Sequence, residues 1–187
     1  ERYMVGETFL STPEKAASYC GDDRLHAAFN FDFTGKHWDP RAYAESIAHW
    51  ETALGDHLWP NYVLGNHDTP RIKTRLLRYR KREQLKVAAA LLLTLRGTPF
   101  IFYGEEIGME NIHLKREEIL DPVSKRYWPV FMGRDSCRSP MQWNTQPNAG
   151  FSTGKPWLPV HPNYVEVNVL DEERQPDSIL NWYRQLI

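Results

Sequence analysis

Acidic side chains follow several short apolar segments of the sequence, at the points where strands would end. Glu7 follows one such segment, Asp68 follows another next to His67, and Glu105 and Glu106 follow a third. Carboxylates that converge on one rim suit the cleavage of a glycosidic bond. One acid must donate a proton to the leaving oxygen, while others, ionised, stabilise a cationic sugar. Acids at strand ends are common in many barrel enzymes, so their spacing alone leaves other chemistry open.

The segments that must position these side chains alternate between strand and helix. Short apolar strands are expected at residues 2–6, 27–33, 59–64 and 100–103, with Asp32 inside the second. Helices are expected at residues 13–19, 41–53, 72–95 (in one or two pieces) and 179–187. Three of them carry start signals, namely Thr12 before Pro13, Asp39 before Pro40, and Asp177 with Ser178.

This alternation predicts an α/β protein with a parallel sheet. No strand-to-helix turn carries a glycine-rich phosphate fingerprint, which disfavours a dinucleotide-binding fold. A (β/α)8 TIM barrel typically needs about 250 residues, so four strands predict half of such a barrel. Residues 105–176 lack clear periodicity, and we expect them to form a functional elaboration over one face.

The composition is that of a globular protein, with 41% hydrophobic residues and a net charge of −1. That charge gives no general attraction to nucleic acid or to an anionic membrane, and we interpret the basic stretch from Lys73 to Lys86 as a solvated helix face. The longest apolar run, residues 87–95, is far short of a membrane span. Cys20 and Cys137 are expected to be free thiols in a reducing compartment, which predicts a cytoplasmic location. No obligate protein partner is expected.

Four segments, in order along the chain, resemble a known family. Val5-Gly6-Glu7 and LGNHDTPR (64–71) look like two short signature regions of the α-amylase family, glycoside hydrolase family 13. The segment RGTPFIFYGEEIGM (96–109) is similar to that family's eighth strand and the loop after it. The segments GRDSCRSPMQWN (133–144) and NAGFSTGKPWLPV (148–160) are similar to its α-glucosidase and oligo-1,6-glucosidase branch.

The resemblance implies a role for each matching residue. Glu7 matches the general acid/base, and Asp68 matches the second acid, which holds the sugar hydroxyls and favours the distorted ring. His67 matches an imidazole that hydrogen-bonds the same sugar, and Arg138 matches the arginine that closes the glucose pocket. Arg71 matches a motif arginine near that site, where a plain salt bridge is nearly as good an interpretation as substrate contact.

The resemblance also implies what these residues do not supply. The family's nucleophile is an aspartate on the fourth barrel strand, and nothing in the sequence matches its motif. We therefore expect residues 1–187 to be a partial catalytic barrel, strands five to eight, without the first four βα units and the C-terminal β-domain. A calcium site known in some members would lie in the missing sequence, so no metal and no cofactor are predicted here.

The expected activity is retaining hydrolysis of α-glucosidic bonds in maltose- or isomaltose-type oligosaccharides, with the 187-residue chain inactive and prone to aggregate by itself. Two alternatives stay open: a sugar isomerase or transglucosidase, and an inactive relative acting as the heavy chain of a transporter. Glu105 and Glu106 would line the pocket or hold the loop. Phe31, Tyr103 and Trp143 are candidate sugar platforms, although core packing is the favoured interpretation of each.

Overall fold

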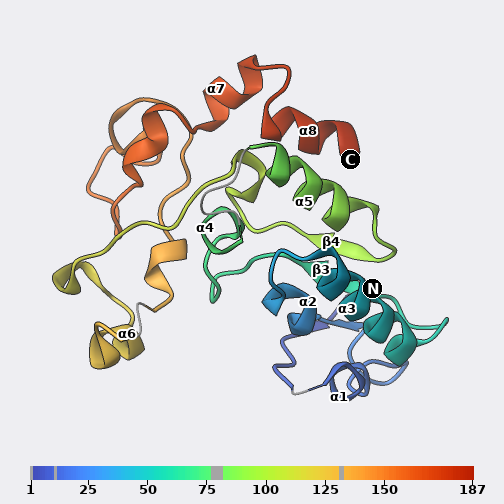
Figure 1. Ribbon diagram of the computed structural model, residues 1–187. Helices are drawn as coiled ribbons and strands as arrows, with labels where there is room; N and C mark the ends of the chain where they lie inside the picture. Colours follow the sequence, from blue (N-terminus) through green and yellow to red (C-terminus); the bar gives the residue numbers. More distant parts are fainter. Residues whose placement is uncertain (1, 11, 77–81, 131–132) are drawn as a thin grey trace. The chain divides into compact units, whose positions relative to one another are not determined.

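The computed structural model describes residues 2–10, 12–76, 82–130 and 133–187 (Figure 1). Its strands are β1 (Val5–Gly6), β2 (Ala27–Ala28), β3 (Asn61–Val63) and β4 (Thr98–Phe100). Its helices are α1 (Pro13–Ala17), α2 (Phe31–Gly35), α3 (Pro40–Leu54), α4 (Ile72–Arg75), α5 (Glu83–Thr94), α6 (Pro122–Tyr127), α7 (Val169–Arg174) and α8 (Ile179–Leu186). Short 3-10 turns lie at Glu105–Ile107, Arg116–Glu118, Asp135–Cys137, Pro147–Gly150 and Pro162–Val165.

The chain forms two compact units. Unit 1 consists of residues 1–64 and 91–101, and unit 2 of residues 65–90 and 102–187. All four strands belong to unit 1, whereas the turn that carries His67 and Asp68 belongs to unit 2.

The strands of unit 1 pair in parallel, as the alternation of strands and helices predicts. β1 pairs with β2, and β3 pairs with β4 in the register that places Tyr62 opposite Pro99. The strands are shorter than expected: Tyr3 and Met4 are exposed rather than buried, and the fourth strand lies at 98–100 instead of 100–103. A run of apolar residues does not by itself say where the ladder of hydrogen bonds ends.

The expected second strand at 27–33 is wrong beyond Ala28. Asn30 ends the extended segment by accepting a hydrogen bond from the Phe33 N–H at 3.0 Å, and α2 starts there. Asp32 therefore lies in the first turn of α2, where an acid is favoured by the helix dipole, and not within a strand.

Helix α3 follows its sequence signals at both ends. The Asp39 carboxylate accepts from the N–H groups of Arg41 and Ala42 at 2.9 Å, with Pro40 in the first turn. Gly55, at φ 65°, ends the helix in a conformation that favours glycine. The cap and the stop thus place the helix where the apolar spacing predicts it.

Buried aromatic rings hold α2 and α3 against β3. The Phe33 ring is fully buried and makes edge contacts with Tyr43 on α3 and Tyr62 on β3, at centroid distances of 4.9 and 5.0 Å. The Thr34 hydroxyl also donates to the carbonyl of Val63 at 2.7 Å. These contacts join two helices to the strand that leads toward the His67 turn.

Gly97 allows β4 to lie close beside β3. A side chain at this position would meet the Pro60 carbonyl oxygen at 2.6 Å, and its φ of 129° also favours glycine. The glycine between α5 and β4 is therefore set by close contact with the backbone of Pro60.

Unit 2 contains more regular structure than its sequence suggests, because residues 105–176 include α6 and α7. The expected helix at 72–95 is described as α4 and α5, with residues 77–81, including Arg78, Arg80 and Lys81, outside the described residues. Helix α8 starts at its expected cap, Ser178, which accepts from the N–H of Asn181.

Two apolar clusters are buried among the described residues of unit 2. Ile112, Leu114, Ile119 and Leu158 form one, and Ile107, Met109 and Met141 form the other. Val169 from α7 and Leu180 from α8 pack against the second cluster. Both clusters draw on the stretch after residue 104, which fixes that stretch in place.

Both cysteines are buried and free, as expected. Of the helices in the described part of the chain, none has the length and apolar character needed to cross a membrane. The cytoplasmic location stays a prediction.

We predict that Phe33→Ala lowers the free energy of unfolding by about 3–5 kcal/mol, because it removes a fully buried ring between two helices and a strand. Urea unfolding followed by circular dichroism measures this loss. Phe9→Ala, which removes a ring that is 84% exposed, is the matched control and should cost less than about 1 kcal/mol. Equal losses for the two variants would contradict the packing role of Phe33.

Candidate active site

A hydrogen-bonded turn presents His67 and Asp68 to solvent. The Asn66 side chain accepts from the Asp68 N–H at 2.9 Å, and the Thr69 hydroxyl accepts from the Asn66 N–H at 3.2 Å. Short polar side chains commonly close turns in this way. The Asn-His-Asp-Thr segment therefore fixes its own backbone and leaves the imidazole and the carboxylate exposed.

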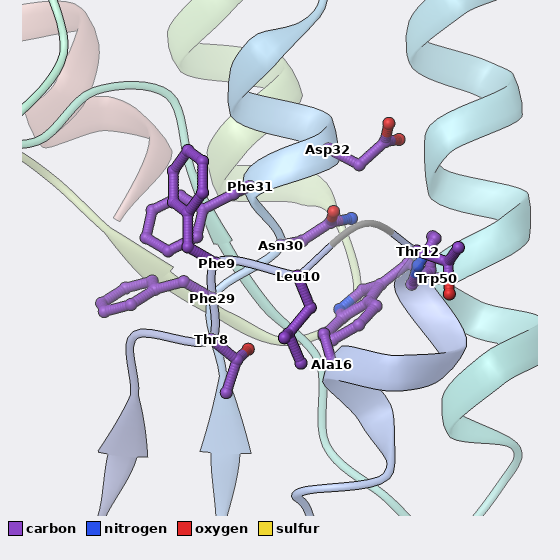
Figure 2. A pocket seen from close by; sticks show the side chains of 11 residues that line it. Thr8, Phe9, Leu10, Thr12, Ala16, Phe29, Asn30, Phe31, Asp32 and Trp50 are labelled. Carbon is purple, nitrogen blue, oxygen red and sulfur yellow. The ribbon is translucent and has the colours of Figure 1, made fainter.

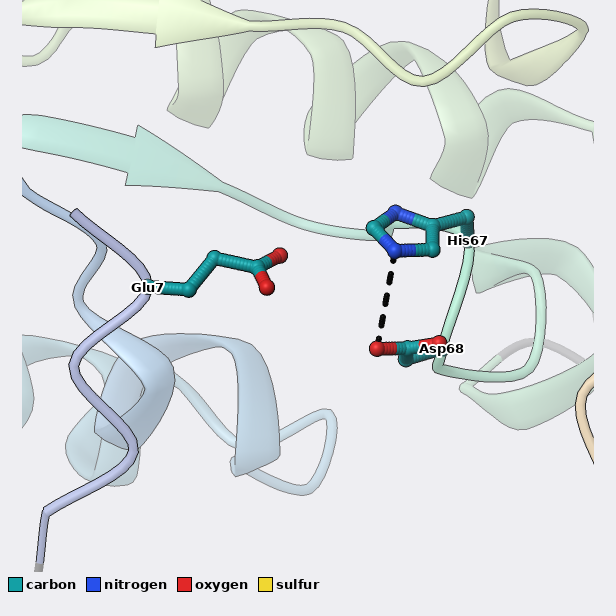
Figure 3. Close-up of side chains that lie close together, drawn as sticks. All are labelled: Glu7, His67 and Asp68. Atoms are coloured by element: carbon teal, nitrogen blue, oxygen red, sulfur yellow. Dashed lines mark ion pairs between the residues drawn. The ribbon is translucent and has the colours of Figure 1, made fainter. Parts of the chain in front are cut away.

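Asp68 is held by three side chains. Its Oδ1 accepts from Arg138 at 2.7 Å and from Arg134 at 3.2 Å, while Oδ2 lies 3.6 Å from Nε2 of His67. The dashed line in Figure 3 marks the pair of Asp68 and His67. Two guanidinium groups thus share one carboxylate oxygen of Asp68, and the other oxygen faces the imidazole.

Arg134 connects Asp68 to a buried carboxylate, Asp121. Its Nη2 and Nε reach the two oxygens of Asp121 at 3.2 and 3.3 Å. Hydrogen bonds from Arg134, and further ones from Ser124 and the Val123 N–H, hold the pKa of Asp121 well below its usual range. The buried carboxylate of Asp121 thereby fixes Arg134, which contacts Asp68. The sequence motifs alone do not single out Arg134.

Arg138 and Cys137 contact the backbone of the turn that carries His67. Arg138 Nε donates to the His67 carbonyl oxygen at 2.7 Å, so one guanidinium binds both the backbone of His67 and the carboxylate of Asp68. The buried Cys137 thiol lies 3.5 Å from that same oxygen and 3.0 Å from the carbonyl oxygen of Arg134. Burial raises the pKa of this thiol, which favours the neutral form.

An open pocket of about 500 Å³ lies beside this centre within unit 2. His67, Arg138 and Glu106 supply its ionisable groups, and Ser139 also lines it. Aromatic rings supply much of its wall, namely Phe102, Tyr103, Trp143, Phe151 and Trp157. Such rings suit the apolar C–H face of a sugar ring.

Core packing, the favoured interpretation of Tyr103 and Trp143, is wrong for both residues. Their exposed fractions are 39% and 47%, and both line the pocket. Phe151 and Trp157 are also pocket residues, although neither is a predicted sugar platform. Each lies in a family-like segment, which is the only signal that points to them. Phe31 belongs to unit 1 and lines a different pocket.

Arg71 is placed apart from the exposed centre. Its residue is 3% exposed, its Nη1 donates to the Tyr103 carbonyl oxygen at 2.6 Å, and its guanidinium stacks on the rings of Phe102 and Tyr103. Arg71 thus supports the aromatic wall from behind. Its contact with a substrate stays a prediction.

Glu105 and Glu106, adjacent in sequence, occupy different environments. Glu106 lines the pocket. Glu105 is buried, and its Oε1 accepts from the Tyr183 hydroxyl at 3.0 Å. Burial raises the pKa of Glu105 to about 8, although the hydrogen bond from Tyr183 acts in the opposite direction. Glu105 therefore joins α8 to the loop after β4 instead of lining the pocket.

Glu7 lies in unit 1, directly after the C-terminal end of β1, and its side chain is exposed. Figure 3 draws its carboxylate extending from that segment. An exposed carboxylate at a strand end is free to approach a ligand, which is the position that barrel enzymes use for catalytic groups.

The exposed centre in unit 2 can bind a neutral, hydroxyl-rich ligand. Asp68 and Glu106 accept hydrogen bonds, Arg138 donates them, and the rings cover apolar faces. The arginines already bound to Asp68 disfavour an added metal cation at its Oδ1. The predicted absence of metal and cofactor stays a prediction.

Comparisons with known proteins match the whole chain. A family profile described as the alpha amylase catalytic domain matches residues 1–187. The probable oligo-1,6-glucosidase 2 of Bacillus subtilis strain 168 is 36% identical, over 98% of this chain and 39% of its own length. The chain thus spans about two fifths of the length of this curated relative.

Solved structures share the fold. The trehalulose synthase MutB from Pseudomonas mesoacidophila MX-45 aligns with a TM-score of 0.85 and 32% identity, and the isomaltulose synthase SmuA from Protaminobacter rubrum with 0.86 and 32%. Each alignment covers 98% of this chain and 39% of the solved chain.

We predict that Glu105→Gln stabilises the protein above neutral pH. Because the folded pKa of Glu105, about 8, lies above its unfolded value near 4.5, the folded state binds the extra proton between these values, and wild-type stability falls as pH rises through this window. The variant lacks that loss, so its advantage should grow to the order of 4 kcal/mol at most above pH 8.

Urea unfolding across this pH range tests the prediction, with Glu117→Gln as the control at an exposed position. A stability difference between Glu105→Gln and wild type that does not change with pH would contradict it.

Proposed function

Because the chain belongs to the α-amylase catalytic-domain family, we propose that it supplies two catalytic carboxylates of a retaining α-glucosidase. Its fold is that of the family's TIM-barrel catalytic domains, and we propose that it forms strands five to eight. The proposed substrates are maltose- and isomaltose-type oligosaccharides. The name of the oligo-1,6-glucosidase relative supports this substrate class.

The observation that carries the proposal is the Asp68 centre, an arginine-bound carboxylate next to an imidazole and an aromatic pocket. In the cleavage of a glucoside, positive charge develops on the ring carbon and ring oxygen. An anion already fixed by Arg138 and Arg134 needs no reorganisation to stabilise that charge. His67 would hydrogen-bond the same sugar ring.

Glu7 is proposed as the acid/base. Its carboxyl proton passes to the glycosidic oxygen as the bond from that oxygen to the anomeric carbon breaks, and the leaving sugar departs as a neutral alcohol. In the same step a nucleophile, which would come from a segment outside these 187 residues, bonds to the anomeric carbon. The carboxylate of Glu7 then takes a proton from water as the water attacks the anomeric carbon and the bond from that carbon to the nucleophile breaks.

The remaining proposed roles concern substrate position. Arg138 would close the pocket around a glucose unit while it binds Asp68. Arg71 would contribute to substrate binding by holding the aromatic rings of Phe102 and Tyr103 in place. The first role has the stronger geometric support, because Arg138 lines the pocket and is only partly buried.

A second candidate function is sugar isomerisation or transfer. It is favoured by the solved structures of a trehalulose synthase and an isomaltulose synthase, which align over 98% of the chain. Hydrolysis and these transfer reactions would use the same acid/base and the same stabilising carboxylate. They differ in whether water or a sugar hydroxyl attacks the intermediate.

We expect Glu7→Gln to lower turnover of maltose or isomaltose by roughly 10²–10⁴-fold, because the variant cannot protonate the leaving oxygen. Because the relatives are longer than this chain, kinetics of the full-length gene product are the measurement. An activated aryl glucoside, whose leaving group needs little protonation, should lose less. Glu14→Gln, at an exposed position on α1, is the matched control, and near-normal disaccharide turnover by Glu7→Gln would refute the assignment.

Product analysis separates the two candidate functions. With isomaltose or maltose, we expect free glucose as the main product of the full-length protein. With sucrose, a hydrolase gives glucose and fructose, whereas an isomerase gives a new disaccharide of the same mass. Chromatography that finds mainly such a disaccharide would replace hydrolysis with isomerisation.

A further inference from the structure

A second pocket lies within unit 1, separate from the aromatic pocket of unit 2. Its volume is about 150 Å³. It is bounded by the segment after Glu7, the start of α1, the junction of β2 and α2, and α3 (Figure 2). None of the roles proposed above uses it.

Asn30 directs hydrogen-bond donors into this pocket. Its Oδ1 is already committed as the cap of α2, since it accepts from the Phe33 N–H at 3.0 Å. That bond fixes the orientation of the amide, so Nδ2 must face away from the helix. The residue is 2% exposed and Nδ2 has no hydrogen-bond partner.

Trp50 and Thr8 add two more unsatisfied groups to the lining. Trp50 is 1% exposed, and its Nε1, which can only donate, has no partner. The Thr8 hydroxyl is also buried without a partner. Figure 2 shows the three side chains around the same space, from the segment after β1, the residue before α2 and α3. Buried polar groups are normally hydrogen-bonded, so these donors indicate an occupant that carries acceptor oxygens.

The charge of the lining disfavours an anionic occupant. Asp32 borders the pocket, and its carboxylate is already bound to Ser46 and Lys36 at 2.5 and 2.8 Å. Among the described residues that line the pocket there is no lysine, arginine or histidine. A bound anion would therefore face a carboxylate with no lining cation to offset it.

The rest of the wall is apolar. Phe9 and Phe31 lie with ring centroids 5.0 Å apart, and Phe29 and Leu10 complete this side. An occupant must therefore combine C–H surface with neutral oxygens. The pocket is partly open to solvent, and a cavity of about this volume accommodates one six-membered ring, so an occupant can place one ring inside while substituents extend toward solvent.

We propose that this pocket binds a small neutral polyhydroxyl compound, one monosaccharide unit in size, through Asn30, Trp50 and Thr8. Thr8 directly follows Glu7 in the chain. An occupant bound to Thr8 would therefore also restrain the segment that carries Glu7. The binding itself does not depend on the proposed catalytic roles.

The test follows the indole N–H resonance of Trp50 in proton–nitrogen spectra during titration with glucose. The resonance is assigned by its loss in Trp50→Phe, which removes the donor and keeps the packing. We expect a saturable shift of this resonance. Asn30→Asp keeps the cap oxygen but replaces the donor, and should weaken the binding roughly three- to tenfold. Thr8→Val replaces Asn30→Asp if that variant does not fold.

Controls separate this pocket from the centre in unit 2. Trp59→Phe removes an indole that donates to Thr98, and it should leave the shift of the Trp50 resonance unchanged. Arg138→Ala should also leave it unchanged, so a failure of the proposed active site is distinguishable from a failure of this proposal. The proposal is overturned by a Trp50 resonance that does not move at the highest soluble glucose concentration. Equal affinity in Asn30→Asp, or tighter saturation by inorganic phosphate than by glucose, would also overturn it.

Discussion

The contact of two arginines with the carboxylate of Asp68 constrains the folding of much of unit 2. Two arginines hold a carboxylate firmly only when both of their side chains are themselves fixed, because mobile side chains would weaken these contacts. Arg138 is fixed because it also binds the His67 carbonyl oxygen. Arg134 is fixed by Asp121, which is in turn bound by Ser124. The loop after β4 therefore has to fold back on the turn from which Asp68 extends.

Two buried acids in this unit have pKa values shifted in opposite directions by their surroundings. Asp121 accepts hydrogen bonds from a guanidinium, a hydroxyl and a backbone N–H, which favour its charged form. Glu105 has one hydroxyl partner and is otherwise desolvated, which favours its neutral form. Their chemical similarity says nothing of this difference, because it arises from what surrounds each of them.

Local signals predicted part of this structure well. The caps at Asp39 and Ser178 and the parallel pairing of strands follow from residue types over a few positions. Strand ends did not follow, because the Asn30 cap competes with the apolar run that continues to Phe33. The exposure of Trp143 and the bond from Arg134 to Asp121 depend on distant segments that meet only after folding. For the proposed site, motif resemblance selected His67, Asp68 and Arg138, which the structure brings together, but it separated neither Arg71 nor Glu105 from the pocket.

Much of the aromatic wall of the pocket in unit 2 comes from one continuous segment of the chain. Trp143, Phe151 and Trp157 all come from one short segment, residues 143–157, whereas the charged centre is built from the segments around Asp68 and Arg138. Three of the five rings in the wall thus lie in a different segment from the residues that carry charge, while Phe102 and Tyr103 come from the stretch after β4. Exchanging residues 143–157 between relatives therefore offers a way to alter ligand preference without changing Asp68 and the arginines that bind it.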